Sequence, residues 1–335
     1  MRRSEFSIAG EKMRMFLTRV FGAMVFAATA AGGASAEVAS ITTPPAGSVW
    51  NTMASVIAAE AQKSGGGRLV VQAYSGNAQM LQAVDSKDAE FTMTDINDMI
   101  VAVAGEGDYS AALPNLRVVA KINPFAVGLF VRADSGMTRV SDLAGKRVPS
   151  GWEAFPLNRP LVSALLEADG ISYGEVVEVP IPDIIRGVDA LASGLTDAAF
   201  FAVGGAKVAE VGAMLGGVRY LQVASDEQAL ETIRKFRPAY YFSEVTPSPV
   251  RVGVDAPMMM LTWDNVLVAG EHVSDEQVKA LLASIFDNVG AIGDAYPPLR
   301  VMNIETAYVY YPGVEYHPGA AAFFAERGVA IRTVD

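Results

Sequence analysis

The pattern of apolar and polar positions divides most of the chain into short strands that alternate with helices. Residues 125–131, FAVGLFV, form an apolar stretch without a breaker, which is typical of a strand buried on both faces of a sheet. Residues 258–269, later in the chain, are expected to form a return strand beside it. We expect these two segments to be the strands on which the chain crosses from one lobe of the protein to another and back.

On both sides of the first crossing, apolar periodicity and turn residues predict repeated strand and helix units. Strands are expected at residues 37–42, 68–74, 91–94, 146–148, 175–179, 197–203, 220–223 and 251–254. Helices are expected at residues 49–63, 78–85, 95 onward, 156–169, 182 onward, 204–215, 226–237 and 277–292. Ser48 is the expected N-cap of the first helix.

This order predicts an α/β fold of two lobes joined by a hinge, with a cleft between the lobes. Lobe I is expected to comprise residues 37–128 and 262–335, and lobe II residues 129–261. In such folds the carboxyl ends of the strands carry ligands, because the N–H groups of the following helices converge there.

The first 36 residues have the features of a secretory signal peptide. Five basic residues precede an apolar run at positions 20–31, and Ala34-Ser35-Ala36 is a small-x-small cleavage signal. The apolar run is shorter than the roughly 20 residues that span a bilayer, which argues against the alternative of a permanent anchor. We therefore expect an exported chain of 299 residues that is soluble after cleavage, located in the periplasm and monomeric.

Composition excludes several classes of protein and site. The whole chain has a formal charge of −11, and removal of the signal peptide changes it to −14, which disfavours binding to nucleic acid or to an anionic membrane. The chain has no cysteine and only two histidines, His272 and His317. It therefore offers no plausible zinc or haem ligand set, and we expect neither metal nor cofactor.

Several segments, in this order, resemble the TAXI family, the solute-binding subunits of tripartite ATP-independent periplasmic (TRAP) transporters. They are YSGNAQMLQAV (74–84), DAEFTMTDIND (88–98), LFVRADSGMTRVSDLAGKRV (129–148), LEADGISYGEV (166–176), VDALASGLTDAAFFAVGG (188–205), YYFSEVTPSPVRVGVDAP (240–257) and YHPGAAAFFAERG (316–328). The resemblance implies a type II-like periplasmic-binding-protein fold with an organic anion in the interlobe cleft. It also implies TRAP membrane permease subunits as partners.

Two loops that the resemblance assigns to the ligand depart from the family's pattern. In place of a Gly-Thr-Gly-Gly-Thr-Tyr-Tyr-like segment the chain has residues 45–51, PAGSVWN, and in place of a Pro-Gly-Ser-Gly-Thr-like loop it has residues 150–158, SGWEAFPLN. Because aromatic residues replace small polar ones, we expect a carboxylate ligand with an apolar or aromatic portion larger than that of glutamate.

Each candidate ligand residue also has a structural interpretation. The polar residues and glycines at helix starts and strand ends could cap helices or form turns, and the aromatic residues could pack in the core. The two cationic residues, Arg159 and Lys207, could lie on the surface. The predicted ligand-binding residues are Gly47, Ser48, Trp50, Asn51, Ser75, Asn77, Thr94, Asn97, Trp152, Phe155, Arg159, Gly204, Gly205 and Lys207.

The sequence favours a binding protein without catalysis, which delivers its solute to a membrane permease. An ABC-type or sensory binding protein of the same fold is the alternative, since it differs only in its partner. An exported enzyme is disfavoured, because no nucleophile with an adjacent base and no telling carboxylate pair is visible.

Overall fold

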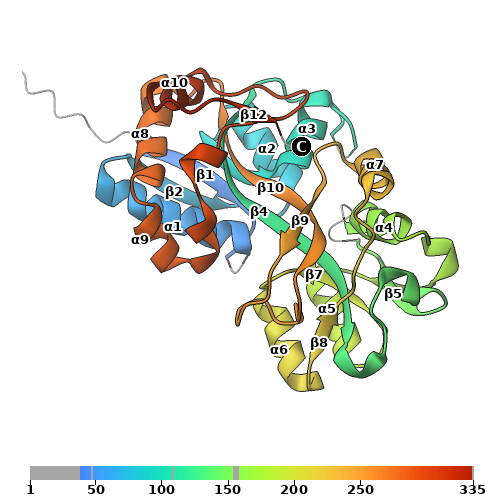
Figure 1. Cartoon of the computed structure of the whole chain (residues 1–335). Coiled ribbons are helices and arrows are strands. Elements are labelled where there is room, and N and C mark those ends of the chain that lie inside the picture. Colours follow the sequence, from blue (N-terminus) through green and yellow to red (C-terminus); the bar gives the residue numbers. More distant parts are fainter. Residues whose placement is uncertain (1–37, 47, 108, 154–157, 334–335) are drawn as a thin grey trace, which may run out of the picture. The chain divides into compact units, whose positions relative to one another are not determined.

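The computed structural model describes residues 38–46, 48–107, 109–153 and 158–333 (Figure 1). The predicted signal peptide, Gly47 and Phe155 lie outside these residues. The strands are β1 (Val38–Thr43), β2 (Arg68–Ala73), β3 (Phe91–Asp95), β4 (Leu116–Arg132), β5 (Arg147–Gly151), β6 (Val177–Ile181), β7 (Ala199–Ala202), β8 (Val218–Tyr220), β9 (Tyr241–Val245), β10 (Met258–Gly270), β11 (Val309–Tyr310) and β12 (Arg332–Thr333).

Helices follow most of these strands, as the sequence pattern predicts. They are α1 (Val49–Ser64), α2 (Asn77–Asp85), α3 (Ile96–Ala104), α4 (Asn158–Ala168), α5 (Ile184–Ala192), α6 (Ala206–Leu215), α7 (Glu227–Phe236), α8 (Asp275–Phe286), α9 (Val289–Ala295) and α10 (Pro318–Glu326). Ser48 caps α1 as expected, because its side chain accepts a hydrogen bond from the backbone N–H of Asn51.

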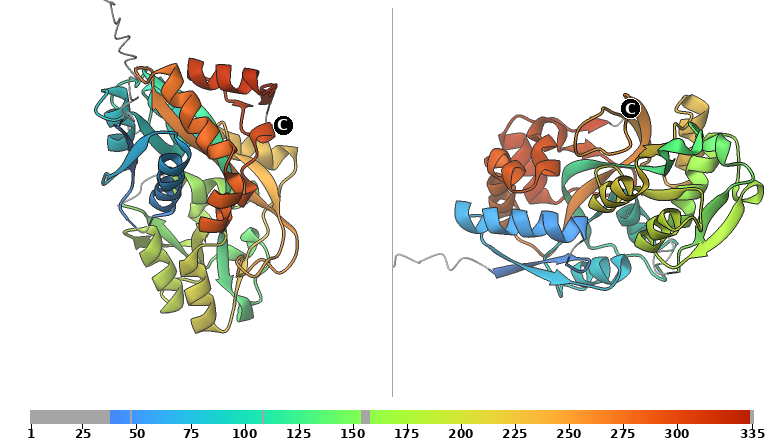
Figure 2. Two further views of the ribbon diagram at one scale, coloured as in Figure 1. Left: turned by 90° about the vertical axis from the view of Figure 1, so that its left-hand side faces the viewer. Right: turned by 90° about the horizontal axis from the view of Figure 1, so that it is seen from below.

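The main sheet has the order β2-β1-β3-β10-β4-β7, with β8 paired to β4 and β9 paired to β10. Strand β1 is parallel to β2 and β3, whereas β10 runs antiparallel to β3, β4 and β9. The two long strands β4 and β10 lie side by side and link the two parts of the molecule (Figures 1 and 2). They are the two crossing strands that the sequence predicts.

Strand β10 exchanges its partner half-way along one edge. Residues Met258 to Thr262 pair with β9, and residues Asn265 to Ala269 pair with β3, while β4 pairs with Leu261 to Gly270 on the opposite edge. Trp263 and Asp264 lie at the exchange, between the two ladders. The segments that meet here, β3 and β9, are far apart in the sequence.

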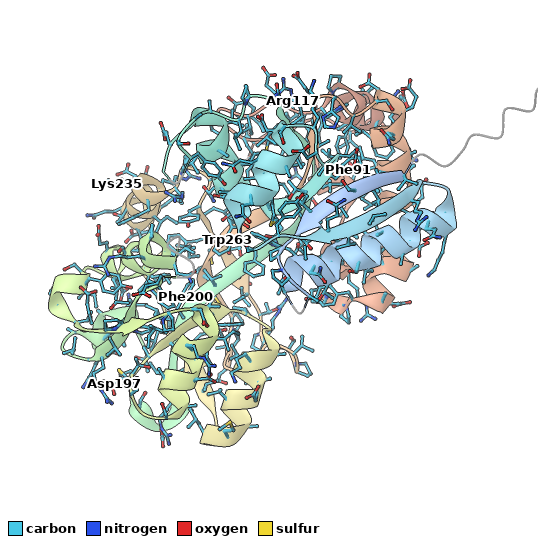
Figure 3. All side chains as sticks on the ribbon, turned by 180° about the vertical axis from the view of Figure 1, so that it is seen from behind. Phe91, Arg117, Asp197, Phe200, Lys235 and Trp263 are labelled. Carbon is cyan, nitrogen blue, oxygen red and sulfur yellow. The ribbon has the colours of Figure 1, made fainter. Side chains whose placement is uncertain are left out.

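Separate apolar cores lie on either side of this exchange. One contains Phe91 and Ile122 beneath α1, α8 and α10, and another contains Phe200 and Leu129 beneath α4 and α7. Figure 3 shows Trp263 between the parts that hold Phe91 and Phe200. Figure 2 shows helices α8 and α9 beside the N-terminal α1, and α10 packs against α8, so the chain returns to its first core after the second crossing.

Three predictions of local structure are wrong. No strand forms at residues 251–254, where Gly253 adopts a positive φ of 88°; the strand that accompanies β10 is β9 instead. The expected helix 277–292 is interrupted after Phe286, where Asn288 turns its side-chain amide back onto the Ser284 carbonyl oxygen (2.9 Å). Strand β4 begins at Leu116, nine residues before the predicted crossing strand.

The predicted lobe boundaries fall inside β4 and β10, and they stay a prediction. Among the described residues, no helix combines the length and the apolar character that crossing a membrane requires.

Candidate functional site

A row of polar side chains crosses three strands at the point where β10 changes partner. Asn265 is paired directly with Asp95 of β3 and with Asn123 of β4. Residues directly opposite each other in antiparallel strands project on the same face, so all three side chains share one face of the sheet. The amide of Asn265 donates to Asn123 Oδ1 (3.2 Å), and Trp50 Nε1 of α1 donates to Asn265 Oδ1 (3.0 Å).

Aromatic rings continue this face toward the second core. Trp263, two residues before Asn265, packs against Phe125 and Tyr240, with ring centroids 5.1 Å and 6.0 Å apart. The indole Nε1 of Trp263 is buried and has no hydrogen-bond partner among the described residues. A buried donor without a partner costs free energy, so it marks a position where a missing acceptor would be stabilising.

The start of α3 contacts the segment that joins α7 to β9. The backbone N–H of Ala239 donates to Asn97 Oδ1 (2.8 Å), which ties these two segments together. Asp95 caps α3, since its Oδ1 accepts from the Asn97 backbone N–H (2.7 Å). Burial raises the pKa of the Asp95 carboxyl to about 7, and the positive charge of Arg237, at the end of α7, opposes that rise.

These observations define one cluster, which we call the crossing site. Its members are Trp50, Asp95, Asn123, Phe125, Arg237, Tyr240, Trp263 and Asn265. It combines hydrogen-bonding amides, aromatic rings and one charge of each sign, which is the composition of a small-molecule recognition site.

Three further buried polar groups lie at helix starts or strand ends without a partner in the described part of the chain. They are the side-chain amide of Asn77 at the start of α2 (both its nitrogen and its oxygen), the hydroxyl of Thr94 in β3 and the amide nitrogen of Asn158 at the start of α4. Asn77 and Thr94 were expected to bind ligand, and their unused hydrogen-bonding capacity is compatible with that role.

The other predicted residues of lobe I make structural contacts. The Ser48 side chain caps α1, Asn51 donates to Thr43 Oγ1 (2.9 Å), and Ser75 donates to Gln79 Oε1 (2.7 Å). Trp50 belongs to the crossing site, and Asn97 lies next to it, hydrogen-bonded to Asp95 and Ala239. The structure thus brings together only part of the predicted set.

Among the described residues, no hydrogen bond, ion pair or ring contact joins the predicted residues of lobe II to members of the crossing site. Trp152 is fully buried in the second core against Phe200, and its Nε1 donates to the Tyr173 hydroxyl (3.4 Å). Because its ring is enclosed by its own core, the structural interpretation of Trp152 holds, and we leave it out of the proposed site. Arg159 forms an ion pair with Glu178 (2.8 Å).

Lys207 and the two glycines before it also have local roles. Lys207 pairs with Asp189 (2.9 Å) and Glu210 (2.8 Å), so its charge is already matched. Gly204 has a φ of +77°, and a Cβ at Gly205 would lie 2.5 Å from the Phe201 ring, so the turn into α6 needs both glycines.

The opposite face of the crossing strands carries a buried carboxylate. Asp264 is fully buried and accepts hydrogen bonds from the hydroxyls of Tyr241 (2.7 Å) and Tyr311 (2.6 Å). Lys121 Nζ lies 2.8 Å from Asp264 Oδ1. Burial and the nearby negative charge raise the pKa values of both tyrosines. This network joins β4, β9, β10 and the C-terminal segment, and its groups satisfy one another.

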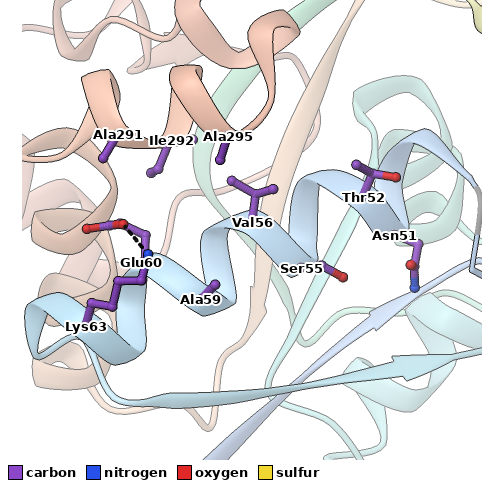
Figure 4. A pocket seen from close by; sticks show the side chains of 10 residues that line it. All are labelled: Asn51, Thr52, Ser55, Val56, Ala59, Glu60, Lys63, Ala291, Ile292 and Ala295. Carbon is purple, nitrogen blue, oxygen red and sulfur yellow. Dashed lines mark ion pairs between the residues drawn. The ribbon is translucent and has the colours of Figure 1, made fainter.

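Surface hollows of the described residues lie elsewhere. One, of about 390 Å³, lies between α1 and α9 and includes Asn51 (Figure 4). Small side chains such as Ser55, Ala59 and Ala291 leave the two helices room to form it. A second, of about 550 Å³, lies beside β6 and α5. Within the described ranges, no three His, Asp or Glu side chains are grouped as metal ligands.

Comparison with known families gives a match over nearly the whole described chain. The sequence profile of the NMT1-like family matches residues 41–328. The chain belongs to the NMT1-like family. The match includes both crossing strands and all the residues of the predicted site.

Solved structures share the fold of this NMT1-like chain at low sequence identity. A TctC solute binding protein from Polaromonas is 16% identical, with a TM-score of 0.50 over 78% of this chain and 86% of the other. MatC from Rhodopseudomonas palustris with bound malate is 16% identical, with a TM-score of 0.51 over 81% and 89%. A periplasmic transporter is 13% identical, with a TM-score of 0.54 over 88% and 93%. The fold is the two-lobed α/β fold of periplasmic solute-binding proteins.

Sequence reasoning missed most members of the crossing site in this NMT1-like protein. Asn123 and Asn265, like Lys121 and Asp264, are polar residues that interrupt the apolar runs of the crossing strands, and these interruptions were a usable signal. Arg237 offered no local signal, because it follows an ordinary charged surface helix. β3 and β9 both pair with β10, one after the other, and this brings the segment before β9 to the start of α3.

Proposed function

We propose that this protein is the extracytoplasmic solute-binding subunit of a TRAP transporter of the TAXI type. It captures a small organic carboxylate at the crossing site and delivers it to the membrane permease. The NMT1-like family membership and the two-lobed fold support the binding role. The segments that resemble TAXI proteins support the choice of transporter.

The observation that carries the proposal is the buried, unpartnered Nε1 of Trp263 at the centre of the crossing site. Folded proteins satisfy nearly all such groups, and exceptions often have a functional reason. A carboxylate or carbonyl oxygen of a solute would accept this hydrogen bond. The Asn158 amide nitrogen, on the helix that packs against α7, is a second unused donor.

The location also suits a hinged mechanism. The site is built from β3 and α1 on one side, from the α7–β9 segment on the other, and from both crossing strands. A solute that contacts all of these segments binds the closed arrangement more tightly than the open one, and it shifts the population toward closure. The predicted apolar portion of the solute would lie against Phe125, Tyr240 and Trp263.

MatC, which shares this fold, holds malate, and this supports a carboxylate as the ligand class. An ABC-type or sensory partner remains the alternative, since the same capture step serves either one. We expect no turnover of the solute. This expectation rests on the solved structures that share the fold, which include a TctC solute binding protein and MatC with bound malate.

Ligand recovery tests the proposal. The exported protein is purified without denaturation, then denatured, and the released small molecules are identified by mass spectrometry. We expect an unchanged organic carboxylate, and we expect Trp263→Phe to retain less of it than the matched variant Trp152→Phe. Recovery of a chemically converted product that accumulates with time would contradict the proposal, as would equal retention by the two variants.

A further inference from the structure

We propose that the crossing site selects an amphoteric solute, whose anionic group binds Arg237 and whose cationic group binds Asp95. This inference rests on the proposed function and narrows its ligand class from carboxylates in general to carboxylates that also carry an ammonium or similar group. The apolar part of the solute lies against Trp263, Phe125 and Tyr240.

Arg237 has the capacity to bind an anion. The residue is half-buried, and its only hydrogen bond from the guanidinium to a described residue is to the adjacent Phe236 carbonyl oxygen (3.0 Å). No described carboxylate lies within ion-pair distance of it, whereas Arg139, Arg147 and Arg159 all form ion pairs. A guanidinium has five N–H donors in a planar fork, so Arg237 retains donors that match a carboxylate.

Arg251 is the other half-buried arginine without an ion pair in the described chain. Its guanidinium donates to the carbonyl and hydroxyl oxygens of Thr246 (2.8 Å and 3.1 Å), and this holds the segment that follows β9. Arg237 lies two residues before Ala239, whose backbone N–H donates to Asn97 Oδ1 (2.8 Å), so it is the arginine of this pair that stands next to the start of α3.

Asp95 has one oxygen available. Both hydrogen bonds that it accepts, from the backbone N–H and the amide of Asn97 (2.7 Å and 3.2 Å), go to Oδ1. Oδ2 has no hydrogen-bond partner among the described residues, and the side chain is partly exposed. A cation at Oδ2 would stabilise the ionised form of a carboxyl whose pKa burial raises to about 7.

The two charges come from opposite sides of the site. Asp95 ends β3, and Arg237 ends α7, next to the segment that Asn97 holds through the Ala239 N–H. They interact electrostatically but do not form an ion pair. A solute with both charges compensates each of them, whereas a dicarboxylate would place a second negative charge near Asp95, which is unfavourable in a partly buried site.

The test uses two sets of compounds, each with one carbon skeleton and different charges. They are phenylalanine, 3-phenylpropionate and 2-phenylethylamine, and leucine, 4-methylpentanoate and 3-methylbutylamine. Binding to the ligand-stripped mature protein is measured by calorimetry at pH 8. In at least one set we expect the amino acid to bind about tenfold or more tightly than either singly charged compound, because each unpaired charge in the site is costly.

Variants of the protein test which residue binds each charged group of the solute. Asp95→Asn, which keeps an N-capping side chain, is expected to bind the amino acid and its carboxylate analogue with affinities within about threefold of each other. Arg237→Gln is expected to weaken both of these compounds about tenfold or more, because both carry the carboxylate. Lys235→Gln, on the exposed surface of α7 (Figure 3), is the matched control and is expected to change neither affinity.

The pH profile gives an independent measurement. The charged or titratable groups that influence Asp95 are Asp98 of α3, Arg237 of α7 and Tyr240. Because protonation of Asp95 removes the partner of the ammonium group, the preference for the amino acid should decline as the pH falls below about 7. The Asp95→Asn variant should show no such decline.

The outcomes separate this inference from the proposed function. If, in every set that binds to the wild type, the carboxylate analogue binds as tightly as its amino acid, the amphoteric ligand is refuted while carboxylate binding stands. If the preference survives in Asp95→Asn, the role of Asp95 is refuted. If no compound of either set binds and the recovered ligand has no cationic group, the inference fails. If the recovered ligand has no carboxylate, the proposed ligand class fails with it.

Discussion

Removing the Tyr311 hydroxyl is expected to destabilise the protein through the buried carboxylate of Asp264. This hydroxyl donates to Asp264 Oδ2 (2.6 Å), and the Tyr311 side chain is only 3% exposed. A hydrogen bond to a charged group contributes about 1.5–3 kcal/mol, and the substitution Tyr311→Phe keeps the ring while leaving one carboxylate oxygen without that donor. We therefore expect the free energy of unfolding to fall by about 1.5–3 kcal/mol.

Tyr310 provides the matched control, since it is the neighbouring residue and is 54% exposed. Urea unfolding followed by circular dichroism should show that Tyr310→Phe changes the free energy by less than about 0.5 kcal/mol, as is usual for surface substitutions. The effects of Tyr241→Phe and Tyr311→Phe should be non-additive, because both hydroxyls donate to Asp264. Equal effects of Tyr311→Phe and Tyr310→Phe would refute the assignment of this network as a stabilising one.

Two further predictions concern stability. A Cβ at Gly66 would lie 2.1 Å from Ser284 Oγ, so Gly66→Ala should lower the unfolding free energy by about 1–3 kcal/mol, as overpacking does. Gly290 lies in α9 with open space around it, so Gly290→Ala should instead raise the unfolding free energy by up to about 1 kcal/mol. The midpoints of urea unfolding compare the two variants, and a loss of stability in both would contradict the reasoning. The second prediction follows from the pKa of Asp95, which is raised from 3.8 to about 7. Since the folded state holds this proton more tightly than the unfolded state, the wild type should lose stability relative to Asp95→Asn as the pH rises through this window, with no further change above it. A difference in unfolding free energy between the two proteins that stays constant from pH 4 to 8 would contradict this prediction.

Local signals were sufficient for most of the helices and strands. These signals act within a few residues, so they can be recognised in the sequence alone. They are the apolar runs of β4 and β10, the cap at Ser48 and the glycines after α1 and α6. The two crossing strands could be recognised because a strand buried on both faces must be apolar over its length. From these elements the two-lobed α/β architecture followed.

Pairings between distant segments could not be recognised in this way. Among the described strands β9 pairs only with β10, which lies later in the chain, and the sequence pattern predicted a strand at residues 251–254 instead. The sequence also could not show that Arg159 and Lys207 are engaged by Glu178, Asp189 and Glu210. Whether a charge is available depends on which neighbours the fold supplies.

The sequence by itself determined the elements, the crossings and the helix starts at which Asn77 and Asn97 lie, because capping and hydrophobic periodicity are local properties. Only the tertiary structure decided that Trp152 packs in a core while Trp263 retains a free indole N–H. It also decided that the segment after α7, which begins with Arg237, is hydrogen-bonded to the start of α3. The physical reason is that β10 changes partner from β9 to β3, and this exchange brings together polar groups that no sequence spacing relates.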